Sequence, residues 1–186
     1  LSDEVYEHIV VDGRTHQSLS RSAALAERTF VVSSFGKTFH VTGWKVATCC
    51  APAPLTTELR RVHQFMVFAV NTPAQHALAA FLAEPPHYEQ LPAFYQAKRD
   101  LFVAGLQRTR LRPLACPGTY FVLADYSAVS EEPETAFAER LTREFGVAAI
   151  PVAGLYAEPV DNRIVRFCFA KRDETLHEAL ARLARI

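Results

Sequence analysis

Apolar side chains recur at three- and four-residue spacing over five stretches of the chain, and this spacing predicts amphipathic helices. The predicted helices cover residues 54–70, 73–82, 92–109, 133–146 and 175–185, and a shorter helix is predicted over 22–27. Asn71-Thr72-Pro73 separates the first two, because asparagine caps a helix and proline favours its first turn. Gly146 closes the fourth helix.

Shorter apolar and β-branched runs lie between these helices and predict strands. The predicted strands cover residues 9–11, 29–33, 45–51, 119–124, 147–151 and 164–170. Asp12-Gly13 is typical of a turn, and residues 34–43 of a loop rich in glycine and hydroxyl groups. Strands mixed with helices in this way predict the α/β or α+β class.

Composition narrows the functional classes. The 20 basic and 20 acidic side chains cancel, so no net charge attracts nucleic acid or an anionic membrane. The four cysteines, Cys49, Cys50, Cys116 and Cys168, form no CxxC pair; we expect reduced, mostly buried thiols in a cytoplasmic protein. The uncharged stretches are too short to span a bilayer, and the scattered histidines and cysteines predict no metal site.

Lys37 is the first candidate for chemistry. It follows a predicted strand and lies among Ser33, Ser34, Gly36 and Thr38, which leave room beside its amine and supply hydroxyl donors. A partly buried lysine with a lowered pKa condenses with aldehydes to a Schiff base. When the residue is taken alone, a solvated loop lysine is the better explanation.

A second cation, Lys45, follows Gly43-Trp44, and together with Ser34 it could bind a phosphate dianion. The alternative is that Trp44 belongs to the core and Lys45 is a surface charge. A nucleotide-binding phosphate loop is a poorer explanation, because the segment lacks the G-x-x-x-x-G-K-[ST] spacing.

Residues 33–46 read SSFGKTFHVTGWKV, and this segment resembles the lysine segment of class I/II aminotransferases of fold type I, which depend on pyridoxal 5′-phosphate (PLP). The resemblance is closest to the methionine, kynurenine and glutamine aminotransferase branch, and it runs from Asp3 to Arg166 and beyond. Ala47 departs from the branch, which commonly has glycine there; we expect the change to be tolerated.

The resemblance implies roles for these residues. Lys37 would hold the cofactor as a Schiff base and then move a proton between the substrate's α-carbon and the cofactor, as nucleophile and general base. Ser34 and Lys45 would bind the cofactor phosphate.

Two further motifs extend the resemblance. Asp3-Glu4-Val5-Tyr6 is similar to the family's Asp-x-x-Tyr, in which the carboxylate pairs with the pyridine nitrogen and the phenol donates to O3′ of the ring. Taken alone, Asp3 and Tyr6 better suit an exposed strand end and a half-buried aromatic; their spacing to Lys37 favours the cofactor roles instead. Residues 162–170, NRIVRFCFA, resemble a strand whose arginine, here Arg166, binds the substrate α-carboxylate through two parallel N–H groups.

The implied architecture is the C-terminal half of a fold type I enzyme, an α/β protein. Residues 1–84 would form the C-terminal part of the large PLP-binding domain, and residues 85–186 a linking helix and the small α+β domain. A missing N-terminal half would supply the Gly-rich phosphate turn, an aromatic that stacks on the ring and an asparagine, so the fragment alone should be inactive. Relatives usually work as homodimers.

The implied activity is transfer of an amino group from a neutral amino acid, such as methionine, glutamine or a kynurenine-like aromatic, to a 2-oxo acid. Two alternatives remain: a PLP-dependent carbon–sulfur β-lyase, and a non-catalytic module that keeps the fold to sense a ligand.

Overall fold

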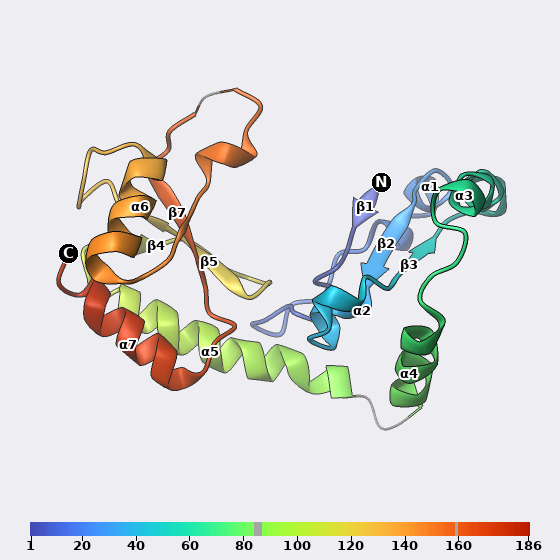
Figure 1. The fold of residues 1–186 in the computed structure, drawn as a ribbon, viewed down its shortest axis with the longest axis horizontal. Coiled ribbons are helices and arrows are strands. Elements are labelled where there is room, and N and C mark those ends of the chain that lie inside the picture. Colours follow the sequence, from blue (N-terminus) through green and yellow to red (C-terminus); the bar gives the residue numbers. More distant parts are fainter. Residues whose placement is uncertain (84–86, 159) are drawn as a thin grey trace. The chain divides into compact units, whose positions relative to one another are not determined.

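The computed structural model describes residues 1–83, 87–158 and 160–186 of the chain. They form two compact units, Leu1–Pro92 (unit 1) and Ala93–Ile186 (unit 2), each with its own sheet (Figure 1). The identification of residues 1–84 with a large cofactor-binding domain, and of residues 85–186 with a linking helix and small domain, stays a prediction.

Unit 1 is built on a three-stranded sheet with the order β1–β2–β3. Its strands are β1 (Ser2–Asp3), β2 (Val31–Ser34) and β3 (Ala47–Cys50). β1 runs parallel to β2, with Asp3 beside Val32, whereas β3 runs antiparallel, with Ala47 beside Ser34. The chain therefore leaves β1 and β2 toward one end of the sheet, and β3 starts from that same end. We call it the Ser34 end.

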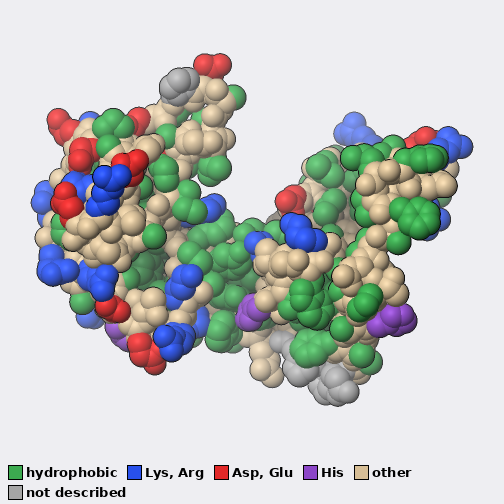
Figure 2. Space-filling view, viewed as in Figure 1, with side chains coloured by type: hydrophobic (Ala, Val, Ile, Leu, Met, Phe, Trp, Pro, Cys, Tyr) green, Lys and Arg blue, Asp and Glu red, His purple; other side chains and the backbone are tan. Residues whose placement is uncertain are grey.

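The helices of unit 1 are α1 (Ala23–Ala26), α2 (Phe35–Thr38), α3 (Ala53–Met66) and α4 (Thr72–Leu82). Asn71 caps α4, because its side-chain oxygen accepts the N–H of Ala74 at 2.9 Å. No residue of α3 is buried, and Phe65 and Met66 at its end are 86% and 79% exposed. Figure 2 shows hydrophobic side chains at the surface in the region of α3. The described part of the chain leaves this helix uncovered.

Unit 2 is built on a four-stranded antiparallel sheet with the order β4–β5–β7–β6. Its strands are β4 (Arg112–Pro113), β5 (Phe121–Asp125), β6 (Ile150–Pro151) and β7 (Ile164–Cys168). Burial alternates along β5 and β7, as period-two side chains require. Val122, Ala124, Val165 and Phe167 are buried on the core face, and the opposite face is partly exposed.

Unit 2 contains α6 (Glu134–Phe145), α7 (Asp173–Leu183) and all but the first two residues of α5 (Leu91–Leu106). Their apolar stripes complete the core with Phe102, Leu106, Phe137, Leu141, Leu176 and Leu183. α5 and α7 approach closely at Gly105, where an added Cβ would lie 2.3 Å from Cδ1 of Leu180.

Glu134, the first residue of α6, is only 1% exposed. Its carboxylate accepts the backbone N–H groups of Ala153, Asn162 and Ile164, the last two at 3.1 Å. A buried carboxylate is tolerated where several donors satisfy it. Glu134 thereby ties α6 to the segment that leads into β7.

The predicted α/β class is confirmed, and the predicted helices and most predicted strands are present. Residues 9–11 form no strand, and the strand predicted over 147–151 is reduced to Ile150–Pro151. The prediction of mostly buried thiols was wrong: Cys49, Cys50 and Cys168 are exposed and Cys116 is half-buried, all as free cysteines. Cys49 and Cys50 are exposed because every residue of β3 is.

No helix within the described ranges is both long and apolar enough to cross a membrane. Among these residues, no three histidine, cysteine, aspartate or glutamate side chains gather as ligands for a metal ion.

Candidate functional site

Lys37 lies in α2, the one-turn helix that follows β2 at the Ser34 end of the sheet (Figure 1). The sequence predicted a loop here; the turn is helical because the Ser34 hydroxyl caps it by accepting the N–H of Gly36 at 3.2 Å. The Lys37 side chain is half-buried. The N–H of Phe35 donates to the carbonyl of Val46 at 3.3 Å, so residues 35–46 form one closed loop.

Gly36 fixes the interior of this loop. Its carbonyl accepts the N–H of Val41 at 3.0 Å and the hydroxyl of Thr42 at 3.2 Å. A Cβ on Gly36 would lie 2.9 Å from Cα of Thr42 and 3.3 Å from the Ser34 hydroxyl oxygen. Only glycine allows this close backbone approach, so the residue next to Lys37 determines the path of the loop.

Lys45 lies at the other end of the closed loop, two residues before β3 begins at Ala47. Its backbone is left-handed, with φ of 56° and ψ of 41°, and its side chain is exposed. An L-residue in this conformation is strained by about 1–2 kcal/mol. Lys45 therefore lies, as a strained residue with a positive charge, at the Ser34 end of the sheet.

Asp3 ends β1 and is exposed, and its carboxylate accepts the N–H of Val5 at 3.3 Å. Tyr6 lies half-buried in the turn that follows, and its carbonyl accepts the N–H of Ile9 at 2.8 Å. Since β1 is parallel to β2, this turn leaves the sheet toward the Ser34 end.

Glu4 lies between these two candidates and was missed by motif reasoning. It is 5% exposed, and its carboxylate accepts the hydroxyls of Ser2 and Ser18 at 2.9 and 3.1 Å and the N–H of Leu19 at 3.1 Å. Nε2 of His16 lies 2.9 Å from the other carboxylate oxygen. Burial alone would raise the pKa of Glu4, but these hydrogen bonds outweigh it and lower the pKa from 4.5 to about 2.

A second residue that the sequence did not single out, Glu7, ties the Tyr6 turn to β2. Its carboxylate accepts a hydrogen bond from the hydroxyl of Ser33, the residue before Ser34. The β1–β2 pairing and this hydrogen bond hold the two motifs together. Asp3, Tyr6, Ser34, Lys37 and Lys45 therefore all belong to segments that meet at the Ser34 end of unit 1.

Arg166, the remaining candidate, is half-buried on the partly exposed face of the unit 2 sheet. In β7 it lies between Leu123 of β5 and Ile150 of β6. Its guanidinium carbon lies 4.6 Å above the centroid of the Phe121 ring. Within the described part of the chain the guanidinium makes no ion pair, so its N–H groups remain available for an anionic ligand.

The groups at the Ser34 end suit pyridoxal phosphate by their chemistry. The Ser34 hydroxyl and the Lys45 ammonium are donors of the kind that bind a phosphate dianion. Lys37 offers a half-buried amine, and Asp3 an exposed carboxylate for a protonated ring nitrogen. Among the described residues neither Lys45 nor Asp3 forms an ion pair that would compete with the cofactor. The residues present therefore fit the group that the resemblance implies.

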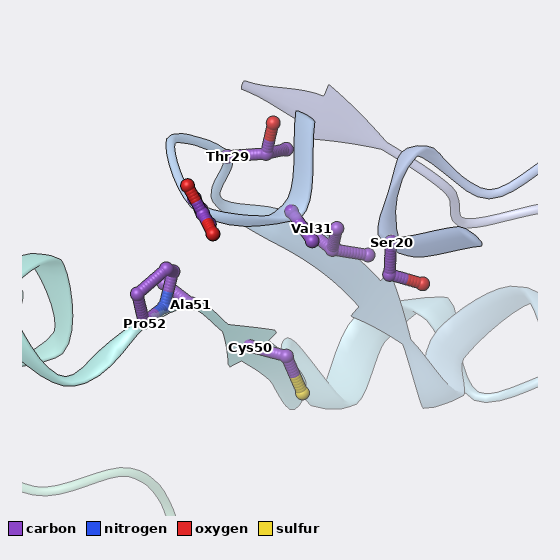
Figure 3. A pocket seen from close by; sticks show the side chains of 8 residues that line it. Ser20, Thr29, Val31, Cys50, Ala51 and Pro52 are labelled. Carbon is purple, nitrogen blue, oxygen red and sulfur yellow. The ribbon is translucent and has the colours of Figure 1, made fainter. Parts of the chain in front are cut away.

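A cavity of about 380 Å³ lies at the opposite end of the unit 1 sheet, where Val31 pairs with Cys50. Figure 3 shows Ser20, Thr29 and Cys50 at this cavity. None of the predicted site residues lines it. A second cavity, of about 430 Å³, is lined by Gly43 and Trp44 of the closed loop together with the start of α4.

The profile of the family "Aminotransferase class I and II" matches residues 1–183. The chain is 52% identical to the methionine aminotransferase of Escherichia coli over 187 residues, which is 100% of this chain and 48% of that protein. It is 36% identical to kynurenine–oxoglutarate transaminase 1 of Mus musculus, over 98% of this chain and 48% of that protein. The chain thus spans about half the length of these relatives.

Solved structures agree. A crystal structure of an Escherichia coli protein with a methionine aminotransferase function matches with a TM-score of 0.96 at 53% identity, over 100% of this chain and 49% of that one. N-succinyldiaminopimelate aminotransferase from Mycobacterium tuberculosis matches with a TM-score of 0.91 at 38% identity, over 98% and 48% of the two chains. The resemblance found in the sequence is confirmed: this chain belongs to the class I and II aminotransferase family.

Proposed function

We propose that the protein to which this chain belongs is a PLP-dependent aminotransferase that transfers the amino group of a neutral amino acid to a 2-oxo acid. The observation that carries the proposal is the meeting of Asp3, Tyr6, Ser34, Lys37 and Lys45 at one end of one sheet. These residues come from three separate segments of the sequence, and the strand pairing is what gathers them.

Lys37 carries the chemistry in this proposal. When bound, pyridoxal phosphate supplies an aldehyde that condenses with amines and a ring that withdraws electrons from the substrate's α-carbon. The Lys37 amine would hold the cofactor covalently, and as general base and acid it would take the proton from the substrate's α-carbon. The tight Gly36–Thr42 contact keeps its backbone in place.

The other candidate residues of unit 1 bind the cofactor phosphate and adjust the charge distribution of its ring. Ser34 and Lys45 donate hydrogen bonds to the phosphate. The Asp3 carboxylate keeps the ring nitrogen protonated, and the Tyr6 phenol donates to the ring oxygen. Glu4 is a positioning residue rather than a ligand: its buried carboxylate binds the His16–Leu19 segment to the chain between Asp3 and Tyr6.

Arg166 binds the α-carboxylate that amino acids and 2-oxo acids share. A guanidinium without an ionic partner in the described chain, set between Leu123 and Ile150, suits one carboxylate in otherwise apolar surroundings. The relatives named for methionine and kynurenine support a neutral or aromatic amino donor. Methionine is the donor that we propose to test first.

The chain spans about half of its relatives' length, so we propose that an N-terminal half completes the cofactor site and that the complete protein acts as a homodimer in the cytoplasm. The uncovered surface of α3 is consistent with further protein packing against unit 1.

The test is a visible absorbance spectrum of the full-length protein with pyridoxal phosphate. We expect a band in the visible that methionine removes and a 2-oxo acid restores. Lys37→Ala should lack the band. Lys171→Ala, which removes an exposed lysine of unit 2, should keep it.

The remaining outcomes separate the alternatives. A protein that stays colourless, or colour that Lys37→Ala does not change, contradicts catalysis at Lys37 and favours a ligand-sensing module. Release of a thiol from a sulfur amino acid, without formation of a new amino acid from the 2-oxo acid, favours the carbon–sulfur β-lyase.

A further inference from the structure

Phe121 is in contact with Arg166 and has no role in the proposed reaction. Its ring lies 4.6 Å from the guanidinium carbon, which is within the range of a cation–π interaction. The two residues are diagonal neighbours, because Phe121 pairs with Cys168 and Arg166 pairs with Leu123. Both side chains are on the partly exposed face of the sheet.

The ring is the guanidinium's only contact among the hydrogen bonds, ion pairs and ring contacts of the described chain. An arginine side chain has four rotatable bonds, and a carboxylate that binds it must also order it. An aromatic ring orders the guanidinium in advance without occupying a hydrogen-bond donor. A carboxylate partner would hold it as firmly but would compete with the substrate.

The side chains on both sides of Arg166 do not compete for its N–H groups. Leu123 and Ile150 lie on the two sides of Arg166 in the neighbouring strands, and neither offers a polar side-chain atom. Ile150 is 47% exposed, so water reaches this face and the contact has the strength of a partly exposed cation–π pair.

We propose that Phe121 is a positioning residue for the substrate: its ring holds the Arg166 guanidinium in the orientation that binds an α-carboxylate in bidentate fashion. This inference rests on the proposed role of Arg166. It goes beyond that role by assigning part of the carboxylate affinity to an uncharged side chain that acts through Arg166.

Because both substrates carry the same carboxylate, loss of the ring weakens the binding of both. The contact acts equally in the ground state and the transition state, so KM rises while kcat does not change. In the full-length protein, Phe121→Leu should raise KM about fivefold for the amino acid and for the 2-oxo acid alike, a factor typical of an exposed to partly buried cation–π contact. Phe121→Tyr keeps a ring and should restore both values.

A binding measurement tests the same point without turnover. Hexanoate carries a carboxylate but no amino group, and its dissociation constant can be measured by calorimetry. We expect Phe121→Leu to raise it about fivefold. The matched control is Phe167→Leu: Phe167 lies on β7 but on the buried face, 5.9 Å from the Phe102 ring. That change should lower stability and leave hexanoate binding unchanged.

Arg166→Lys separates the inference from the proposed function. If Arg166→Lys leaves both KM values and hexanoate binding unchanged, the role of Arg166 is wrong. If Arg166→Lys weakens binding but Phe121→Leu acts no more than Phe167→Leu, only the inference about Phe121 is overturned. The double variant Phe121→Leu/Arg166→Lys should bind hexanoate no more weakly than Arg166→Lys alone. If the two losses of affinity multiply in the double variant, Phe121 does not act through Arg166.

Discussion

Nε2 of His16 lies 2.9 Å from the carboxylate of Glu4, which also accepts hydrogen bonds from two hydroxyls and a backbone N–H; Glu4 is only 5% exposed. In the sequence, Glu4 lies between Asp3 and Tyr6, the two residues to which we assign the cofactor ring. Its hydrogen bonds hold residues 16–19 against β1. A position that motif reasoning leaves unassigned is therefore a structural anchor of the candidate site.

Glu4→Gln should destabilise the protein in a pH-dependent way. The pKa of Glu4 is lowered from 4.5 to about 2 in the folded chain, so its charge stabilises the fold above pH 4.5 and this contribution is lost as pH falls from 4.5 to 2. We expect a loss of about 1–3 kcal/mol at pH 7. Urea unfolding from pH 7 to pH 2 measures it.

The exposed Glu58 on α3 is the control for this experiment, because Glu58→Gln should change the free energy of unfolding by less than about 0.5 kcal/mol. A Glu4→Gln difference that stayed constant from pH 7 to pH 2 would show that the carboxylate contributes through shape and not through charge.

Gly36→Ala should damage the Lys37 loop. The new methyl group would lie 2.9 Å from Cα of Thr42, so backbone atoms must move. We expect a loss of about 1–3 kcal/mol in stability and weaker binding of pyridoxal phosphate. Gly43→Ala, in the same loop, adds a methyl group that meets nothing within 4 Å, and it should be neutral in both measurements. Equal effects of the two changes would contradict the steric explanation.

Glu134→Ala should be among the more destabilising single changes in unit 2. It leaves the N–H groups of Ala153, Asn162 and Ile164 without their acceptor in a buried setting. We expect a loss of about 2–5 kcal/mol, seen as a lower midpoint of thermal unfolding. Glu139→Ala, on an exposed turn of the same helix, controls for helix propensity and should change little. A loss for Glu134→Ala no larger than for Glu139→Ala would mean that water replaces the carboxylate.

Gly105→Ala should separate α5 from α7, because the added Cβ would lie 2.3 Å from Cδ1 of Leu180. We expect a loss of about 1–3 kcal/mol. Leu180→Ala alone should also destabilise, by opening a cavity. The double variant should be more stable than the sum of the two single losses predicts, since the smaller side chain makes room for the methyl group. Additive losses in chemical unfolding would contradict direct contact.

Local signals in the sequence were sufficient for the longer helices, α3 to α7, but not for the one-turn helix α2. Asn71 caps α4 as its position before Thr72-Pro73 predicts, and Gly146 ends α6 in a left-handed conformation. Both are short-range effects of backbone chemistry. β1 and β4 have two residues each, too few to show any periodicity, and only pairing with β2 and β5 defines them.

The candidate site was likewise only partly predictable from the sequence. The motif around Lys37 and the Asp3–Tyr6 motif are visible in the sequence, because family resemblance depends on short runs of residues. Glu7 and Phe121 are not, because their partners, Ser33 and Arg166, are assigned by strand register and turn geometry across gaps of 26 and 45 positions. Hydrophobic spacing also gave no information on Cys49 and Cys50, which are exposed because every residue of β3 is.

The Ser34 end has a consequence for stability as well as chemistry. A ligand that contacts Asp3, Ser34 and Lys45 at once bridges the end of β1, the end of β2 and the residues just before β3. Such a ligand binds the folded sheet and not the unfolded chain, so its binding free energy adds to the folding free energy of unit 1. Thermal unfolding of the protein would then report occupancy of the cofactor site, and the apoprotein would be the form most exposed to proteolysis.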